Sequence, residues 1–72
     1  MSLDGTAGVI INGDHRRVQA GTTLAQLIAE IGLDPVRVAV ERNLEIVPRS
    51  TFESVIVEDG DDYEIVHFVG GG

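Results

Sequence analysis

Apolar and polar residues follow a helical pattern in one part of the chain and alternate in several shorter parts. The helical part spans residues 23–32, where four apolar residues recur every three or four positions and predict one buried face: Leu24, Leu27, Ile28 and Ile31. Thr23 is expected to cap this helix, with Gln26 completing a capping box. Gly32 and Pro35 are expected to end it.

Short segments before and after the helix have the character of strands. Residues 8–13 (GVIING) lead into a two-residue hairpin turn at Asn12–Gly13, since both residues tolerate positive φ. Residues 14–20 form the polar return strand, which suits a sheet edge. Residues 36–43 place Val38 and Val40 on one face, residues 45–47 form a short strand, and residues 63–69 form the last one. Residues 50–54 fit one helical turn, with Phe52 as a buried anchor.

The order of these elements predicts an α+β fold with a mixed sheet. The hairpin and the later strands would form a sheet that packs on the one main helix, with the last strand in the middle beside the first. This is the β-grasp, or ubiquitin-like, arrangement. We expect a loose leader over residues 1–8, the β-grasp domain over residues 9–69 and a flexible glycine tail over residues 70–72.

Alternate side chains of the last strand point to opposite faces. One set is Tyr63, Ile65, His67 and Val69; the other is Glu64, Val66 and Phe68. We assign Ile65 to the core, so Val66 and Phe68 form an exposed apolar patch beside the tail and are predicted to contact a partner. A register shifted by one residue would instead bury Phe68.

The sequence ends in Gly70, Gly71 and Gly72, directly after this apolar strand. Glycines carry no side chain and adopt backbone angles freely, so such a segment can thread a narrow channel of an enzyme. The α-carboxylate of Gly72 would become reactive once ATP converts it to an acyl-adenylate, and sulfur could then displace AMP to give a thiocarboxylate. The alternative is that the glycines are a flexible end or a linker.

Size, composition and charge narrow the function further. A chain of 72 residues forms one small domain, too small for a deep pocket of its own, which argues against a self-contained enzyme. Cysteine is absent, and no apolar run or leader resembles a membrane span or a secretory signal, so we expect a cytoplasmic protein. The net charge of −7 makes nucleic acid and anionic membranes poor partners and favours a basic protein surface.

Other polar residues have simpler explanations than chemistry. His67 could be a base near the tail, but an ordinary strand residue is favoured. The aspartates Asp59, Asp61 and Asp62 lack the spacing of a calcium loop and indicate a turn around Gly60. Three arginines are expected to be solvated, although Arg49 could touch a partner: Arg16, Arg17 and Arg49.

Several stretches resemble the sulfur-carrier family of thiamine biosynthesis, ThiS. They are Val47-Pro48-Arg49 followed by Phe52, Asp59-Gly60-Asp61, and the ending EIVHFVGGG. The resemblance covers residues 9–72 and is most specific in the second half. The family's diglycine corresponds to Gly71 and Gly72, with Gly70 as a third small residue.

The resemblance implies a recycled co-substrate with no cofactor of its own. A ThiF-type adenylyltransferase would activate Gly72 with ATP, a donor such as a cysteine desulfurase would supply sulfur, and the thiocarboxylate would deliver it to thiazole synthase. Three alternatives stay open: a sulfur carrier for molybdenum-cofactor synthesis, a ubiquitin-like tag that joins Gly72 to lysines of other proteins, and a plain interaction module.

Overall fold

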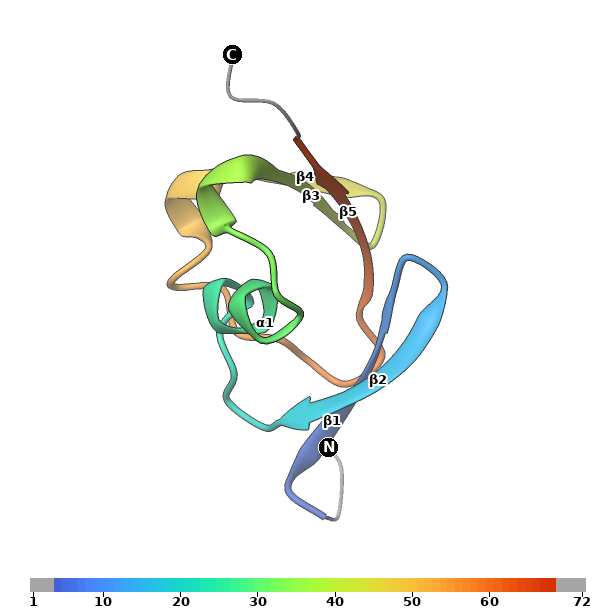
Figure 1. Ribbon diagram of the computed structural model, residues 1–72. Coiled ribbons are helices and arrows are strands. Elements are labelled where there is room, and N and C mark those ends of the chain that lie inside the picture. Colours follow the sequence, from blue (N-terminus) through green and yellow to red (C-terminus); the bar gives the residue numbers. More distant parts are fainter. Residues whose placement is uncertain (1–3, 69–72) are drawn as a thin grey trace.

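A computed structural model describes residues 4–68, which form one sheet, one α-helix and two short 3-10 helices (Figure 1). The elements are β1 (Thr6–Ile11), β2 (Asp14–Gln19), α1 (Leu24–Glu30), η1 (Pro35–Arg37), β3 (Val38–Arg42), β4 (Glu45–Val47), η2 (Arg49–Thr51) and β5 (Asp62–His67). The boundary expected between leader and domain is too late. β1 begins at Thr6, because Thr6 pairs with Gln19 and Ala7 is buried, so residues 6–8 belong to the sheet.

The five strands follow the order β2-β1-β5-β3-β4, with β5 in the middle. β5 runs parallel to β1 and antiparallel to β3, which confirms the mixed sheet and the β-grasp arrangement. The hairpin turn is as predicted, since φ is 50° at Asn12 and 87° at Gly13. The Asn12 side chain also extends the β1–β5 contact: its Nδ2 donates to the Ile65 carbonyl over 3.1 Å and its Oδ1 accepts from the Ile65 amide over 2.8 Å.

The helix α1 has the predicted ends. The Thr23 side chain accepts from the Gln26 amide and the Gln26 side chain accepts from the Thr23 amide, which completes the capping box. Gly32, two residues after Glu30, has a φ of 86°, a left-handed conformation that glycine adopts without steric cost. Leu24, Leu27 and Ile28 are fully buried, while Ile31 lies at the margin of the core. No helix within residues 4–68 is long and apolar enough to cross a membrane.

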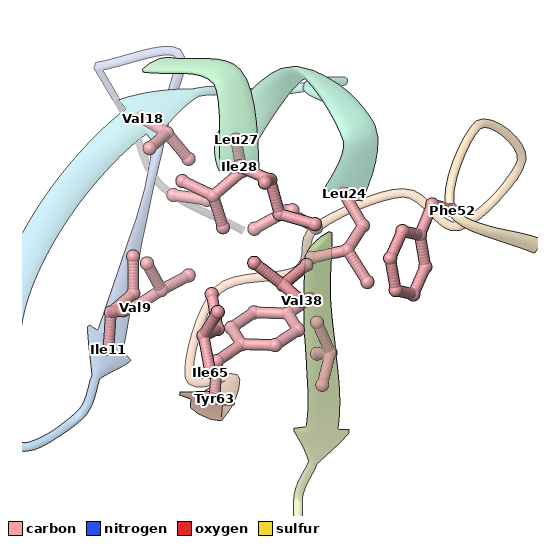
Figure 2. Packing of buried hydrophobic residues seen from close by; sticks show 13 residues of the cluster. Val9, Ile11, Val18, Leu24, Leu27, Ile28, Val38, Phe52, Tyr63 and Ile65 are labelled. Carbon is pink, nitrogen blue, oxygen red and sulfur yellow. The ribbon is translucent and has the colours of Figure 1, made fainter. Parts of the chain in front are cut away.

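The hydrophobic core lies between α1 and the inner face of the sheet (Figure 2). The helix presents Leu24, Leu27 and Ile28 to residues of β1, β3 and β5, and Phe52, after η2, closes one side as predicted. Each fully buried aliphatic or aromatic side chain of this kind contributes about 1.5–3 kcal/mol. The sheet residues of this core are Ala7, Val9, Ile11, Val18, Val38, Val40, Tyr63 and Ile65.

Candidate functional site at the end of the last strand

The backbone of β5 is held by β3 almost as far as the glycine segment, whereas β1 and the Asn12 side chain hold it only as far as Ile65. His67 pairs with Val38 of β3, and the Phe68 amide donates to the Arg37 carbonyl over 2.8 Å, one residue beyond the strand. Figure 1 shows this end of β5 at the opposite end of the molecule from the start of β1. The sheet therefore fixes the chain through Phe68. Gly70, Gly71 and Gly72 lie outside the described residues, and their role stays a prediction.

Val66 and Phe68 are both exposed, with 58% and 49% of their surface accessible, as the assumed register predicts. Tyr63 and Ile65 point into the core, so the alternation along β5 is also as expected. His67 belongs to the inward set but is exposed, because β5 ends there and its partner Val38 is the first residue of β3. That Val66 and Phe68 contact a partner stays a prediction.

The exposed apolar surface is wider than the sequence suggested. Ala39 lies opposite Val66 on β3, and Ile46 of β4 is 81% exposed on the same face of the sheet. Phe68 flanks a hollow of about 210 Å³ together with Val38, Pro48 and Phe52. The pairing of β3 with β5 brings these residues together, and this pairing is not visible in the order of residues along the chain.

Arg49 has a structural contact that the sequence analysis missed. Its Nη2 donates to the Val38 carbonyl over 3.2 Å, which links η2 to the first residue of β3. Val38 in turn pairs with His67, so Arg49 supports the strand pair that ends at the tail. Its side chain borders the hollow beside Phe68, where it stays accessible to a partner.

The aspartates near Gly60 form a turn, as predicted, but one of them is buried. Asp61 is only 5% exposed and accepts hydrogen bonds from several donors. The Tyr63 hydroxyl lies 2.8 Å from Oδ2, Arg42 Nε lies 3.0 Å from Oδ2, and Asn43 Nδ2 lies 3.2 Å from Oδ1. The Glu58 amide donates to Oδ2 over 2.9 Å. Asp61 therefore ties the turn to β3 and β5.

Charge and burial act in opposite directions at this cluster. Burial alone would raise the pKa of Asp61, but the hydrogen bonds from Glu58, Tyr63, Arg42 and Asn43 together outweigh it and hold that pKa below its ordinary value. Burial and the neighbouring Asp61 carboxylate raise the pKa of the Tyr63 phenol, which therefore stays protonated and donates a hydrogen bond to Asp61. The cluster stabilises the fold at the start of β5, the opposite end of the strand from the glycine segment.

No group of three or more histidine, aspartate and glutamate side chains within residues 4–68 could hold a metal ion. Asp59 binds the Gly8 amide through Oδ1 over 2.7 Å, so it fastens the turn to β1. What the molecule presents instead is a firmly held strand end beside an exposed apolar face.

A small domain with this strand order and one helix belongs to the class of ubiquitin-like, or β-grasp, proteins, and comparisons identify the family. The ThiS family model matches residues 9–72, so the chain belongs to the ThiS family. Members of this family are sulfur carriers of thiamine biosynthesis and are not enzymes.

Individual relatives agree with this family. The chain is 46% identical to the sulfur carrier protein ThiS of Bacillus subtilis over 63 residues, which cover 86% of this chain and 96% of that protein. A crystal structure of the thiamine biosynthesis protein ThiS from Geobacter metallireducens matches with a TM-score of 0.74 and 29% identity, covering 90% of this chain and 99% of that one.

A thiazole synthase of Paramagnetospirillum magneticum is 53% identical over 64 residues, or 89% of this chain. The chain spans only about a fifth of that protein's length, and the same holds for a thiazole synthase of Magnetococcus marinus. These proteins therefore contain a segment similar to this chain within a much longer polypeptide.

Proposed function

We propose that this protein carries sulfur on the α-carboxyl group of Gly72 and delivers it to thiazole synthase for the thiazole ring of thiamine. The observation that carries the proposal is the family match through residue 72, which includes all three glycines after the firmly held β5. Thiazole synthase as the acceptor is supported by the two proteins of that name that contain a similar segment.

The reaction needs two partner activities besides thiazole synthase. A ThiF-type adenylyltransferase would join the Gly72 carboxylate to the α-phosphate of ATP, releasing pyrophosphate. Sulfur from a donor such as a cysteine desulfurase would then attack the acyl carbon, and the bond to AMP would break. If the donor is a persulfide, a thiol must cleave the resulting acyl disulfide to leave the thiocarboxylate.

The geometry suits a substrate of other enzymes. The sheet holds β5 through Phe68, so the glycines after it would leave the domain at a defined point. Val66 and Phe68 lie beside that point and would contact the adenylyltransferase. Adenylation would need a free carboxylate at Gly72, and the protein would act in the cytoplasm, where ATP is available to the adenylyltransferase.

Deletion of Gly71 and Gly72 tests this function in cells. A strain whose only copy lacks both glycines should require thiamine, and the thiazole precursor alone should restore its growth while the pyrimidine precursor should not. A matched strain that lacks Ser2 and Leu3 should grow without either. Normal growth of the glycine-deleted strain without thiamine would contradict the proposal, and a requirement unrelated to the thiazole would redirect it to another sulfur acceptor.

A further inference from the structure

Two glutamates face each other across the outer side of the sheet. Glu41 of β3 lies directly opposite Glu64 of β5 in the antiparallel pair. The neighbouring positions on this face are apolar: Ile46 of β4 lies opposite Glu41, and the pair Ala39 and Val66 lies next along the strands. Both glutamates are exposed, so their carboxylates are charged groups at the edge of the apolar surface.

This arrangement costs stability, since like charges directly opposite each other on neighbouring strands repel. Among residues 4–68, the recorded ion pairs all involve other acidic residues: Asp4, Asp34, Glu58 and Asp61. The nearest arginine along β3, Arg42, points to the inner side and is engaged by Asp61 and Glu58. None of these ion pairs within residues 4–68 includes Glu41 or Glu64.

A shallow hollow of about 140 Å³ lies between the two glutamates and the apolar residues. Ala39, Ile46 and Val66 supply apolar walls, and Glu41 and Glu64 line the same hollow. Ligand pockets usually measure about 300–1,000 Å³, so this hollow is too small for a cofactor and suits the end of one long side chain.

We propose that this hollow is a socket for an arginine side chain on the surface of thiazole synthase. The aliphatic part of the arginine would lie on Ile46 and Val66, and its guanidinium would lie between Glu41 and Glu64. The inference rests on the proposed function, in which thiazole synthase receives the sulfur. It adds which surface of the carrier recognises that enzyme and which side chain of the enzyme is recognised.

Charge complementarity and shape together favour arginine as the occupant. A guanidinium is planar and carries five N–H donors, so one group can bind two carboxylates at once, whereas the ammonium of lysine is a compact point charge. Arginine is also enriched at protein interfaces because its stem packs on apolar surface while its head makes polar contacts. The partner's cation would remove the repulsion between the glutamates that the free carrier retains.

The test measures how tightly thiazole synthase of the same organism binds the full-length carrier and its variants by isothermal titration calorimetry. The double variant Glu41→Gln/Glu64→Gln should bind about tenfold or more weakly than the wild type at low salt. Added salt should weaken the binding of the wild type to thiazole synthase far more than the binding of this variant. The melting temperature of the double variant should be higher than that of the wild type by about 1–8 °C, because the like-charge pair is gone.

A control variant removes two charges from exposed positions outside this face, Asp14 of β2 and Glu30 of α1. Asp14→Asn/Glu30→Gln should bind thiazole synthase within about threefold of the wild type, since no close charge pair is lost. Because the Glu41→Gln/Glu64→Gln variant is expected to be more stable than the wild type, weaker binding cannot be attributed to unfolding.

The outcomes separate this inference from the proposed function. Equal binding of wild type and double variant would overturn the socket while leaving sulfur delivery intact. If the double variant binds thiazole synthase normally but binds the adenylyltransferase more weakly than the wild type does, thiazole synthase is not the partner that occupies the socket. If the wild type acquires the thiocarboxylate but does not bind thiazole synthase, both the socket and delivery to that enzyme are wrong.

Discussion

Acidic residues lie on both sides of the sheet formed by β3 and β5, and their surroundings differ. On the inner side, Asp61 is buried and accepts hydrogen bonds from Arg42, Asn43, Tyr63 and the Glu58 amide. On the outer side, Glu41 and Glu64 face each other in the open, and no ion pair is recorded for either in the described chain.

This difference separates residues that hold the fold from residues available to a partner. A buried carboxylate is tolerated only when its hydrogen bonds are satisfied, and Asp61 meets that condition. A like-charge pair beside exposed apolar residues makes the free domain less stable, so its presence is explained by a contact made with another molecule. Inner and outer side chains of β3 and β5 thus have separate tasks, which substitutions can test.

The largest expected effect comes from the inner side. Asp61→Ala would leave the Arg42 guanidinium and the Tyr63 hydroxyl without their acceptor, so the free energy of unfolding should fall by about 3 kcal/mol or more. Urea unfolding measures this change. The control Asp62→Ala removes an exposed carboxylate one residue away and should change stability by less than about 0.5 kcal/mol. Equal effects of the two variants would contradict the structural role of Asp61.

The same carboxylate predicts a pH dependence of stability. The pKa of Asp61 is lower in the folded protein than its value of about 3.9 in an unfolded chain. Its contribution is therefore fully present above about pH 4 and is lost as the pH falls toward the folded-state pKa. The difference in unfolding free energy between wild type and Asp61→Asn should shrink below about pH 4, as urea titrations would show. A difference that stays constant would mean that Asp61 does not titrate with folding.

Phe52 and Phe68 provide a matched pair, because one ring is buried in the core and the other is half-exposed at the end of β5. Phe52→Ala removes a buried ring and should cost about 3–5 kcal/mol, whereas Phe68→Ala removes a half-exposed ring and should cost less than about 1 kcal/mol. Phe68→Ala should instead weaken binding to the adenylyltransferase by about tenfold, measured by calorimetry. Unfolding of the Phe68→Ala variant would show that this side chain stabilises the domain.

The smallest effect has the opposite sign. Glu41→Lys would convert the repulsive pair with Glu64 into an attractive one, so the free energy of unfolding should rise by about 0.2–1 kcal/mol. Binding to thiazole synthase should be lost in the same variant. Asp14→Lys on β2 makes the same charge change at an exposed position away from the outer face and should affect neither property strongly. A loss of stability on Glu41→Lys would contradict the idea that repulsion between Glu41 and Glu64 destabilises the free domain.

Local patterns in the sequence were sufficient to predict most of the fold. Thr23 with Gln26, Asn12 with Gly13, and Gly32 each specify a cap or turn through their own chemistry, and the structure confirms them. The alternation along residues 63–68 also placed Val66 and Phe68 on the outside. The predicted start of the domain, at residue 9, was wrong. Thr6 and Ala7 belong to β1 because they pair with β2, and they form no apolar run of their own.

What the sequence did not reveal depends on contacts between distant segments. The aspartates near Gly60 looked alike along the chain, and only the packing of β3 against β5 distinguishes the buried Asp61 from its neighbours. Likewise, Glu41 and Glu64 are more than twenty residues apart and become a pair through strand register. Arg49 gained a structural role for the same reason, because Val38 is brought beside it by the fold.

The proposed function depends on sulfur bound at Gly72, and intact mass spectrometry can detect that sulfur. The protein is incubated with the adenylyltransferase, ATP and a sulfur donor, beside a variant that lacks Gly71 and Gly72. We predict a mass increase equal to the replacement of one oxygen by sulfur in the wild type and none in the variant. An unchanged wild-type mass, with the adenylyltransferase shown to be active on another carrier, would contradict the assignment of sulfur transfer to this tail.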